Sequence, residues 1–254
     1  MSVLLVCDVG NTEITLALFD GERLARRGRL RTHDPRDAAQ LVDDLRDFVG
    51  ADPVARCAIA SVVPTATEAL VRATATAFGT RARILDATGA WPITIAVDEP
   101  AAVGVDRLVN CAAAHLLHRC DTIVVDLGTA TTYDCVTAEG RFLGGAIAPG
   151  VRTSLDALVG RTAQLRATPL EAPPRAIGTR TDLAIRAGVV FGAVDALEGM
   201  VRRLAREWPG GAAPLVIATG GLAATVAPLC PSVGLVDPEL TLTGIRLVTA
   251  LRGD

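Results

Sequence analysis

Residues 123–135 read IVVDLGTATTYDC, and this stretch is the best guide to the architecture of the chain. An apolar run leads directly to an aspartate, Asp126, and then to a glycine and a cluster of threonines. An unpaired carboxylate is costly to bury, so a buried strand needs a reason to carry one. The same order occurs near the N-terminus, where VLLVCDVGNTEITLAL places Asp8 and Gly10 after an apolar strand. Two strands with the same ending indicate a duplicated unit.

Both halves of the chain continue from this opening into alternating strands and helices. A DG pair at 20–21 between two alternating runs predicts a hairpin. Hydrophobic periodicity predicts helices over 36–48, 65–78, 104–118, 150–159, 182–206 and 221–228 and from about 240 onward. In the second half, strands are predicted over 122–127 and 131–137. The pattern therefore predicts an α/β protein of two similar lobes, residues 1–119 and 120–254, with a cleft between them.

The charged residues exclude several classes of function. The net charge is −3, and no basic run is longer than a pair, whereas nucleic-acid binding normally leaves a concentrated basic footprint. All 25 basic residues are arginine. A Walker-type phosphate loop and a Schiff-base mechanism both need lysine. If the chain handles a nucleotide, it does so by another route.

The apolar residues point to a globular protein of the cytoplasm. The six cysteines have no CxxC spacing and mostly lie in apolar runs, where cysteine acts as a small core residue. The sequence contains no apolar run of the roughly 18 residues that a membrane span requires, and the N-terminus lacks a charged region before its apolar start. We therefore expect no membrane association.

The two strand ends with the DxG pattern suit the binding of phosphate groups. Glycine lets the backbone approach an anion closely. Free N–H groups, together with Asn11 and Thr12 in the first turn or Thr129 and Thr131 in the second, can donate to the phosphate oxygens of a nucleotide in the cleft. The two aspartates would lie where a metal ion screens phosphate charge. The alternative is that Asp8 and Asp126 only cap the turns that follow them.

Other polar islands carry weaker signals. Residues 104–107, GVDR, begin a predicted helix, where Asp106 could accept a proton from a hydroxyl group and Arg107 could bind a carboxylate bidentately. The alternative is a dipole partner beside a surface charge. The stretches GGAIAPG at 144–150 and ATGG at 218–221 are predicted to be glycine-rich turns after apolar strands.

Seven motifs together resemble one family closely. They occur in the order seen in type III pantothenate kinases, over about residues 3–248. The motifs are DVGNT (8–12), ASVVP (60–64), GVDR (104–107), VDLGTATT (125–132), GGAIAPG (144–150), GTRT (178–181) and ATGG (218–221). The resemblance implies two RNase H-like lobes of the acetate and sugar kinase/Hsp70/actin superfamily. It also implies a homodimeric kinase that transfers the γ-phosphoryl group of ATP to pantothenate, giving 4'-phosphopantothenate in the first step of coenzyme A synthesis.

The resemblance also implies roles for individual residues. The expected ATP contacts are Asp8, Gly10, Asn11, Thr12, Thr15, Thr129, Gly220 and Gly221. The expected pantothenate site comprises Gly104, Val105, Asp106 as general base, Arg107 on the carboxylate, and Thr181, which the family supplies from the partner subunit. Asp126 matches the family's ligand for a monovalent cation, potassium or ammonium, and ATP is expected to bring Mg²⁺.

Two positions depart from the family pattern. Val97 stands where the family usually has a tyrosine, and Arg166 stands where it usually has a proline. Three interpretations follow. The chain is an active pantothenate kinase, a paralogous kinase that phosphorylates another small hydroxylated acid or alcohol, or a nucleotide-binding regulatory protein without turnover.

Overall fold

The computed structural model describes residues 3–32, 38–210 and 213–253, and the contacts divide the chain into two compact units. Unit 1 comprises Met1–Pro92, Asp98–Ala113 and Leu240–Asp254, and unit 2 comprises Ile93–Val97 and Ala114–Glu239. The division differs from a single cut between residues 119 and 120 chiefly in two segments. Strand β6 (Thr94–Ile95) pairs with the sheet of unit 2, and the C-terminal helix packs on the sheet of unit 1.

Unit 1 is built on a five-stranded mixed sheet of order β3-β2-β1-β4-β5. The strands are β1 (Val3–Val9), β2 (Glu13–Asp20), β3 (Arg23–Arg31), β4 (Val54–Ser61) and β5 (Ala82–Leu85). Strands β1, β2 and β3 form an antiparallel meander, and β4 and β5 run parallel to β1. The predicted hairpin is confirmed: β2 and β3 meet at Gly21, whose φ of 61° favours glycine.

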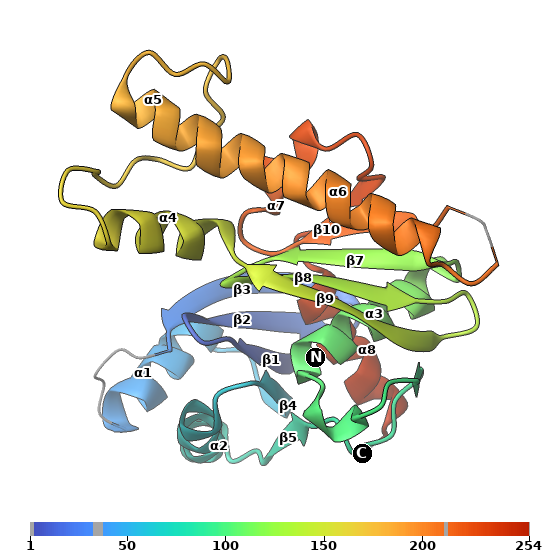
Figure 1. Cartoon of the computed structure of the whole chain (residues 1–254). Coiled ribbons are helices and arrows are strands. Elements are labelled where there is room, and N and C mark those ends of the chain that lie inside the picture. Colours follow the sequence, from blue (N-terminus) through green and yellow to red (C-terminus); the bar gives the residue numbers. More distant parts are fainter. Residues whose placement is uncertain (1–2, 33–37, 211–212, 254) are drawn as a thin grey trace. The chain divides into compact units, whose positions relative to one another are not determined.

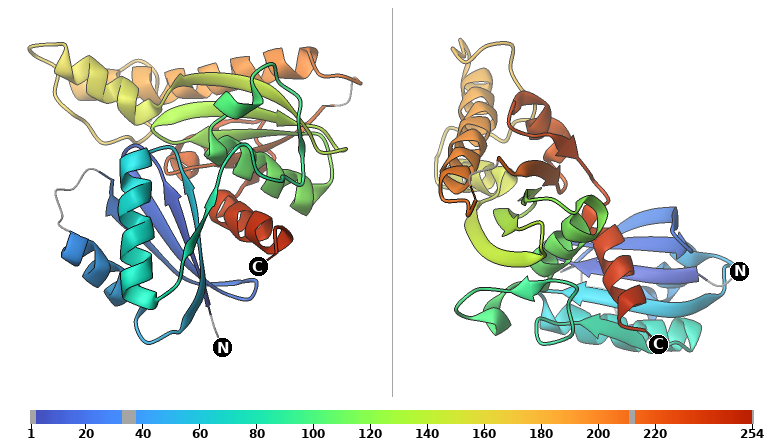
Figure 2. Two further views of the ribbon diagram at one scale, coloured as in Figure 1. Left: turned by 90° about the horizontal axis from the view of Figure 1, so that it is seen from below. Right: turned by 90° about the vertical axis from the view of Figure 1, so that its right-hand side faces the viewer.

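Helices cover both faces of this first sheet. Helices α1 (Ala38–Val49) and α2 (Pro64–Phe78) share one hydrophobic core with the inward side chains of β1, β2 and β4. Helix α8 (Leu240–Leu251) lies on the opposite face, as Figure 2 shows. It packs against the first part of α3 (Val105–His118), which follows the short 3-10 helix η1 (Pro100–Ala102). The predicted helices over 65–78 and 104–118 are confirmed, and residues 36 and 37 of the predicted first helix lie outside the described residues.

Unit 2 repeats the same plan. Its sheet has the order β11-β10-β7-β8-β9-β6, with the strands β7 (Thr122–Leu127), β8 (Ala130–Val136), β9 (Arg141–Pro149), β10 (Leu215–Thr219) and β11 (Leu235–Val236). Strands β7, β8 and β9 form an antiparallel meander, and β10 and β11 run parallel to the first strand. Order and direction match those of unit 1, with β6 added at one edge. The predicted class, α/β with two similar RNase H-like lobes, is thus confirmed.

One face of the second sheet is covered by a long helical rod and the helix before it. Helix α4 (Val151–Gly160) precedes an irregular connection, and α5 (Thr181–Arg186), the π-helical turn η2 (Ala187–Phe191) and α6 (Gly192–Arg206) follow each other end to end (Figure 1). The helix predicted over 182–206 is confirmed, with a π-helical turn inside it that periodicity does not show. Helix α7 (Ala223–Val226) and the 3-10 turn η3 (Ala227–Leu229) follow β10.

The prediction of a glycine-rich turn at 144–150 is wrong. Residues 144–149 belong to β9, and Gly145 lies so close to β8 that a Cβ there would be 1.6 Å from the carbonyl oxygen of Tyr133. Gly144 has a φ of 95° beside a register shift in the ladder with β8. Here glycine serves a bulged strand rather than a chain reversal.

Candidate functional site

The first DxG turn connects β1 to β2 in unit 1. Asp8 is the penultimate residue of β1 and is half-buried, and its cross-strand partner on β2 is Thr15. Gly10 begins the turn, and the next two residues, Asn11 and Thr12, are exposed. The structure therefore brings the predicted residues of this turn together and leaves its tip accessible to a ligand.

The predicted acceptor site, residues 104–107, lies at the start of α3. Oδ1 of Asp106 accepts a hydrogen bond from the N–H of Arg107 at 2.9 Å. A Cβ at Gly104 would lie 2.5 Å from this oxygen, so glycine makes room for the carboxylate. Asp106 and Arg107 are half-buried, and Val105 between the glycine and this pair is buried. The motif thus places an acidic and a basic residue next to each other in the first turn of one helix, with the carboxylate held by a backbone N–H.

The second DxG turn lies in unit 2, at the end of β7. Asp126 is half-buried, and its cross-strand partner on β8 is Thr132. Gly220, which follows β10, has a φ of 90°, and a Cβ there would lie only 2.3 Å from Oδ1 of Asp126. Gly221 has open space around it. The predicted cation ligand and the predicted adenosine-side turn are therefore neighbours.

Thr129, a predicted ATP contact, is exposed in the turn between β7 and β8. Its carbonyl oxygen accepts hydrogen bonds from Oγ1 of Thr153 at 2.6 Å and from the N–H of Gly150 at 3.2 Å. A Cβ at Gly150 would lie 2.3 Å from the same oxygen. Sequence reasoning missed these supports, although Gly150 is the last residue of the GGAIAPG motif.

Thr181 is not brought to Asp126 within unit 2. It begins α5, is exposed, and lines a cavity of about 690 Å³ that Leu127 and Tyr133 also line. Side chains alternate between the faces of a strand, so Asp126 lies on the opposite face of the sheet from Leu127 and from this cavity.

Three ionisable groups lie at, or next to, the residues that line that cavity. Burial raises the pKa of Tyr133 to about 12, which keeps this phenol neutral. Beside Thr181, the guanidinium group of Arg180 donates to both carboxylate oxygens of Asp182, at 3.0 and 2.6 Å. Hydrogen bonding to Arg180 lowers the pKa of Asp182, so the pair stays charged.

A buried carboxylate that sequence reasoning did not single out lies near Asp126. Asp134 of β8 is fully buried, and its Oδ2 accepts a hydrogen bond from Oγ1 of Thr132 at 2.8 Å. Asp126 and Thr132 are cross-strand partners, and Asp134 follows two residues later on the same face. The sequence does show an aspartate inside a predicted strand, two residues after Thr132 and therefore on the same face of that strand. The three residues make a polar stripe across β7 and β8.

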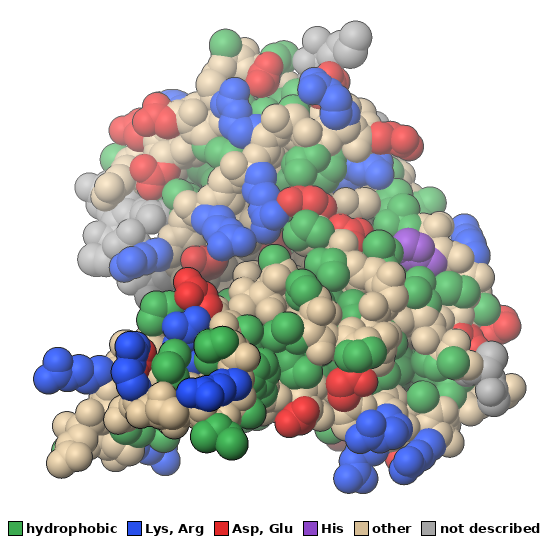
Figure 3. Space-filling view, turned by 90° about the horizontal axis from the view of Figure 1, so that it is seen from above, with side chains coloured by type: hydrophobic (Ala, Val, Ile, Leu, Met, Phe, Trp, Pro, Cys, Tyr) green, Lys and Arg blue, Asp and Glu red, His purple; other side chains and the backbone are tan. Residues whose placement is uncertain are grey.

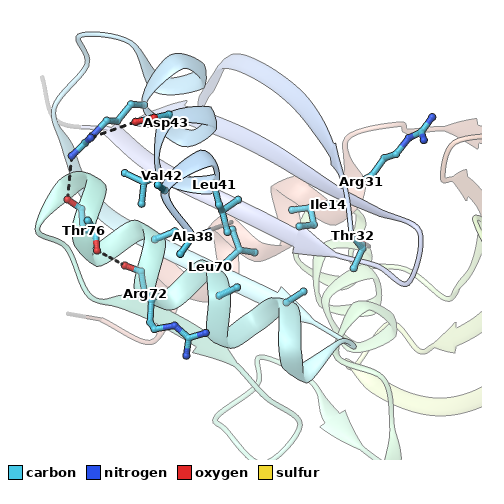
Figure 4. Close-up of a pocket in the computed structure, with 15 residues that line it drawn as sticks. Ile14, Arg31, Thr32, Ala38, Leu41, Val42, Asp43, Leu70, Arg72 and Thr76 are labelled. Atoms are coloured by element: carbon cyan, nitrogen blue, oxygen red, sulfur yellow. Dashed lines mark hydrogen bonds and ion pairs between the residues drawn. The ribbon is translucent and has the colours of Figure 1, made fainter. Parts of the chain in front are cut away.

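A second cavity of about 690 Å³ lies in unit 1 between α1 and α2. Leu41 and Val42 of α1 and Leu70 of α2 point into it, whereas Arg31 and Arg72 extend away from it (Figure 4). None of the described residues that line this cavity is a predicted site residue. Its interior is apolar, so it is a groove between two packed helices rather than the candidate site.

The surroundings of Asp126 suit a cation that binds this one carboxylate and takes its other ligands from substrate and water. Across the described ranges, no three His, Cys, Asp or Glu side chains gather closely enough to hold a metal ion. Asp126 is flanked by Gly128 and Gly220, which carry no side chain and leave room beside the carboxylate. Potassium and magnesium both accept oxygen ligands from substrate and water, so one carboxylate is a suitable protein contribution.

The face of unit 2 in Figure 3 carries charged side chains of both signs with hydrophobic side chains between them. In the same unit, Leu158 of α4 is 38% exposed and Ile177 is 79% exposed.

In the part of the chain that the structure describes, no helix has both the length and the apolar character needed to cross a bilayer.

Comparisons with known proteins identify relatives over the whole chain. A family model described as type III pantothenate kinase matches residues 4–203. A type III pantothenate kinase of Thermus thermophilus is 42% identical over 257 residues, which covers 99% of this chain and 100% of the relative. Another from Parafrankia sp. is 41% identical over 248 residues, 97% of each chain.

The fold is shared more widely than the sequence. The crystal structure of the ethanolamine utilization protein EutJ from Carboxydothermus hydrogenoformans has a TM-score of 0.59 at 18% identity, over 98% of this chain and 90% of that one. At this identity the likeness concerns the fold alone. The family model, in contrast, matches most of the chain, and the relatives with about 40% identity match nearly all of it. On these findings the chain belongs to the type III pantothenate kinase family.

Proposed function

We propose that this protein phosphorylates pantothenate with ATP, giving 4'-phosphopantothenate and ADP in the first step of coenzyme A biosynthesis. The observation that carries the proposal is the match to type III pantothenate kinases over nearly the full chain at about 40% identity. Two accessible DxG turns, and an acidic and a basic residue at a helix start, supply the kinds of groups that this reaction needs.

In unit 1, we assign Asp106 as the general base and Arg107 as the ligand of the pantothenate carboxylate. Oδ1 of Asp106 already accepts the N–H of Arg107, which orients the carboxylate. Gly104 and Val105 complete the acceptor site. In the reaction, the substrate hydroxyl oxygen attacks the γ-phosphorus, its proton passes to Asp106, and the bond from the γ-phosphorus to the bridging oxygen breaks to release ADP.

The two DxG turns are assigned to ATP. Asp8, Gly10, Asn11, Thr12 and Thr15 would contact the phosphates in unit 1. In unit 2 the assigned ATP contacts are Thr129, Gly220 and Gly221. Phosphoryl transfer depends mainly on positioning and on neutralising charge. Backbone N–H groups at glycine-marked turns do both without a lysine.

Asp126 is assigned as the protein ligand of a monovalent cation, potassium or ammonium, and ATP is expected to bind as its Mg²⁺ complex. These cations would neutralise negative charge on the phosphates. The room left by Gly128 and Gly220 beside the carboxylate supports the assignment.

We further propose a cytoplasmic homodimer in which Thr181 acts in the active site of the partner subunit. Thr181 is exposed and lies on the face of its sheet opposite Asp126, so it is poorly placed to serve the cation site of its own unit. Exposed apolar side chains such as Ile177 in the same unit are what an interface would cover.

A different acceptor is the second candidate function, and Val97 is the observation that favours it. Val97 is half-buried beside Gly144 and replaces the tyrosine that the family usually has. A smaller, apolar side chain there would suit another small hydroxylated acid or alcohol, with the same kinase chemistry. If the protein binds ATP but turns over with no acceptor, a regulatory nucleotide-binding protein is the remaining interpretation.

The test is ATP consumption by the purified protein with pantothenate and Mg²⁺, in potassium and in sodium buffer. We expect turnover that depends on potassium, and we expect Asp106→Asn to lower kcat by about 10²- to 10⁴-fold, the usual contribution of a general base. Asp98→Asn is the matched control, because it removes an exposed carboxylate of the same unit.

Three results would contradict these assignments. Full activity of Asp106→Asn would remove Asp106 from catalysis, and equal rates in sodium would remove the potassium requirement. Binding of ATP without turnover of pantothenate would reject the proposed acceptor, and an acceptor screen would then separate the other kinase from the regulatory protein.

A further inference from the structure

Thr32, which directly follows β3, holds the first DxG turn with two hydrogen bonds. Its Oγ1 donates to the carbonyl oxygen of Gly10 at 2.6 Å, and its N–H donates to that of Thr12 at 3.1 Å. The β2–β3 ladder ends at the pair of Glu13 and Arg31. The N–H bond therefore extends the ladder by one pair, whereas the hydroxyl bond reaches beyond it into the turn.

Thr153, in the first turn of α4, does the same for the second DxG turn. Its Oγ1 donates to the carbonyl oxygen of Thr129 at 2.6 Å, and the N–H of Gly150 donates to the same oxygen. In both units, then, one threonine hydroxyl and one backbone N–H from the segment after the meander's third strand hold carbonyl oxygens of the turn after its first strand. The two turns differ in length, so the anchored carbonyl groups are not at equivalent positions. In unit 1 the carbonyl belongs to the glycine of the DxG motif, and in unit 2 it belongs to the residue after that glycine.

An anchored carbonyl fixes the direction of the next N–H group. A trans peptide unit is planar, and its C=O and N–H point in opposite directions. Anchoring the carbonyl of Gly10 therefore directs the N–H of Asn11 away from Thr32. Anchoring the carbonyl of Thr129 likewise directs the N–H of Ala130 away from Thr153. N–H groups held in one direction are what a turn needs to bind an anion.

We propose that Thr32 and Thr153 are positioning residues, one for each DxG turn, that orient the N–H groups of Asn11 and Ala130 toward the phosphates of ATP. This inference rests on the proposed binding of ATP by these turns. Neither threonine belongs to the predicted site, and each acts on the side of the peptide unit that faces away from the ligand. Thr32 lines the groove between α1 and α2, at the end where Ile14 also lies (Figure 4).

Thr32→Val and Thr153→Val test the proposal, because valine keeps the branched shape and the backbone N–H but removes the hydroxyl donor. We expect each variant to bind a non-hydrolysable ATP analogue about three- to ten-fold more weakly by calorimetry, the usual effect of one lost hydrogen bond. KM for the acceptor should stay unchanged. Thr32→Ser and Thr153→Ser keep the hydroxyl and should bind the analogue within about two-fold of the unmodified protein.

Matched controls separate positioning from stability. Oγ1 of Thr80 donates to the carbonyl oxygen of Val54 in unit 1, and Oγ1 of Thr162 donates to that of Leu158 in unit 2. Thr80→Val and Thr162→Val remove comparable bonds away from the turns. They should lower the unfolding temperature to a similar degree without changing the affinity for the analogue.

Amide resonances give a readout that needs no ligand. In ¹⁵N-labelled protein, Thr32→Val should shift the Asn11 amide resonance and Thr153→Val the Ala130 resonance, while the serine variants should not. If the unmodified protein fails to bind ATP, the proposed function is wrong, and the amide shifts still decide whether the threonines orient the turns. Should a valine variant be too unstable to purify, the alanine variant removes the same hydroxyl.

The proposal is overturned if the valine variants keep both the affinity and the amide resonances of the unmodified protein. It is also overturned if each serine variant binds the analogue as weakly as its valine counterpart, because the hydroxyl would then not be responsible.

Discussion

Gly220 shows how much of the site in unit 2 depends on a missing side chain. Its φ of 90° is in the region that other residues rarely adopt, and the space where a Cβ would lie is within 2.3 Å of Oδ1 of Asp126 and 2.7 Å of the backbone nitrogen of Leu127. A substitution therefore meets both backbone strain and a steric clash with the proposed cation ligand.

Gly220→Ala is expected to lower the free energy of unfolding by about 3 kcal/mol or more, as strain and overpacking combined usually do. The control is Gly79→Ala. Gly79 has a φ of 67° at the end of α2 but no atom within 4 Å of a built Cβ. Gly79→Ala should lower the free energy of unfolding by only about 1–2 kcal/mol, the cost of an alanine in the left-handed conformation.

Urea unfolding measures both changes, and activity in potassium reports whether Asp126 has moved. Equal losses of stability in Gly220→Ala and Gly79→Ala would show that the contact with Asp126 adds nothing to the backbone strain.

At the scale of single residues, the sequence predicts the position of the polar residues in the fold well, because polar residues after apolar strands are unusual. Asp8 and Asp126 both lie at such strand ends, as predicted. The sequence does not reveal the roles of Asp134 and Thr153, because those roles depend on a hydrogen bond to another residue. A threonine in a helix or an aspartate in a strand looks ordinary until its hydrogen-bond partner is known.

At the scale of elements, the contact between α3 and α8 depends on close approach. A Cβ at Gly244 of α8 would lie 2.6 Å from the carbonyl oxygen of Val109 and 3.1 Å from Cβ of Ala113, both on α3. Within unit 1, Oγ1 of Thr241 also donates to Oδ1 of Asn110 at 2.8 Å. Helix α3 begins with the GVDR motif, so α8 supports the helix that carries the proposed general base.

Gly244→Ala is expected to destabilise the protein by about 1–3 kcal/mol, because the added methyl group pushes α8 away from α3. Gly199→Ala, in α6, is expected to stabilise it by about 0.5–1 kcal/mol, since alanine favours the helix and only the flexible end of Arg202 lies within 4 Å. Thermal unfolding of the two variants should therefore shift in opposite directions. A gain in stability for Gly244→Ala would mean that helix propensity outweighs the packing contact.

Local sequence patterns predicted most helices and strands. They failed where glycine can mark either a turn or a bulged strand. Helices over 65–78 and 104–118 and the first hairpin follow from local patterns, and the structure has them. The motif GGAIAPG predicts a turn, because glycine usually marks one. In β9 the glycines instead admit a bulge and the close approach of Tyr133, which depend on the neighbouring strand and are invisible in a local pattern.

At the scale of the whole molecule, the sequence predicted two similar lobes but not the composition of each unit. The repeat of strand order and direction confirms the duplication. A helical pattern shows that the last helix buries one face, but it does not show which sheet covers that face. The structure places α8 on the sheet of unit 1, against β1 and β4.

A chain that ends at Glu239 should therefore lose the integrity of unit 1. It lacks the buried residues Leu240, Leu242, Ile245 and Val248. Each buried side chain of this size is worth about 1.5–3 kcal/mol, so the loss is on the order of the whole stability of a domain. Hydrogen exchange measured by mass spectrometry should show lost protection in β1 and β4 and retained protection in β7 and β10.

A chain ending at Arg252 is the control, because it keeps all of α8 together with the stacking of Arg252 on Trp91. Retained protection of β1 in the shorter chain would contradict the assignment of α8 to unit 1.

The return of the last helix to the first unit has a consequence for synthesis on the ribosome. Met1–Pro92 emerges first, yet its sheet lacks part of its cover until Leu240–Asp254 has been translated. Unit 2, by contrast, needs nothing after Glu239 and can be complete before the last helix has been made. A nascent chain that stalls late therefore displays an uncovered apolar sheet face, the kind of surface that chaperones and quality-control proteases engage.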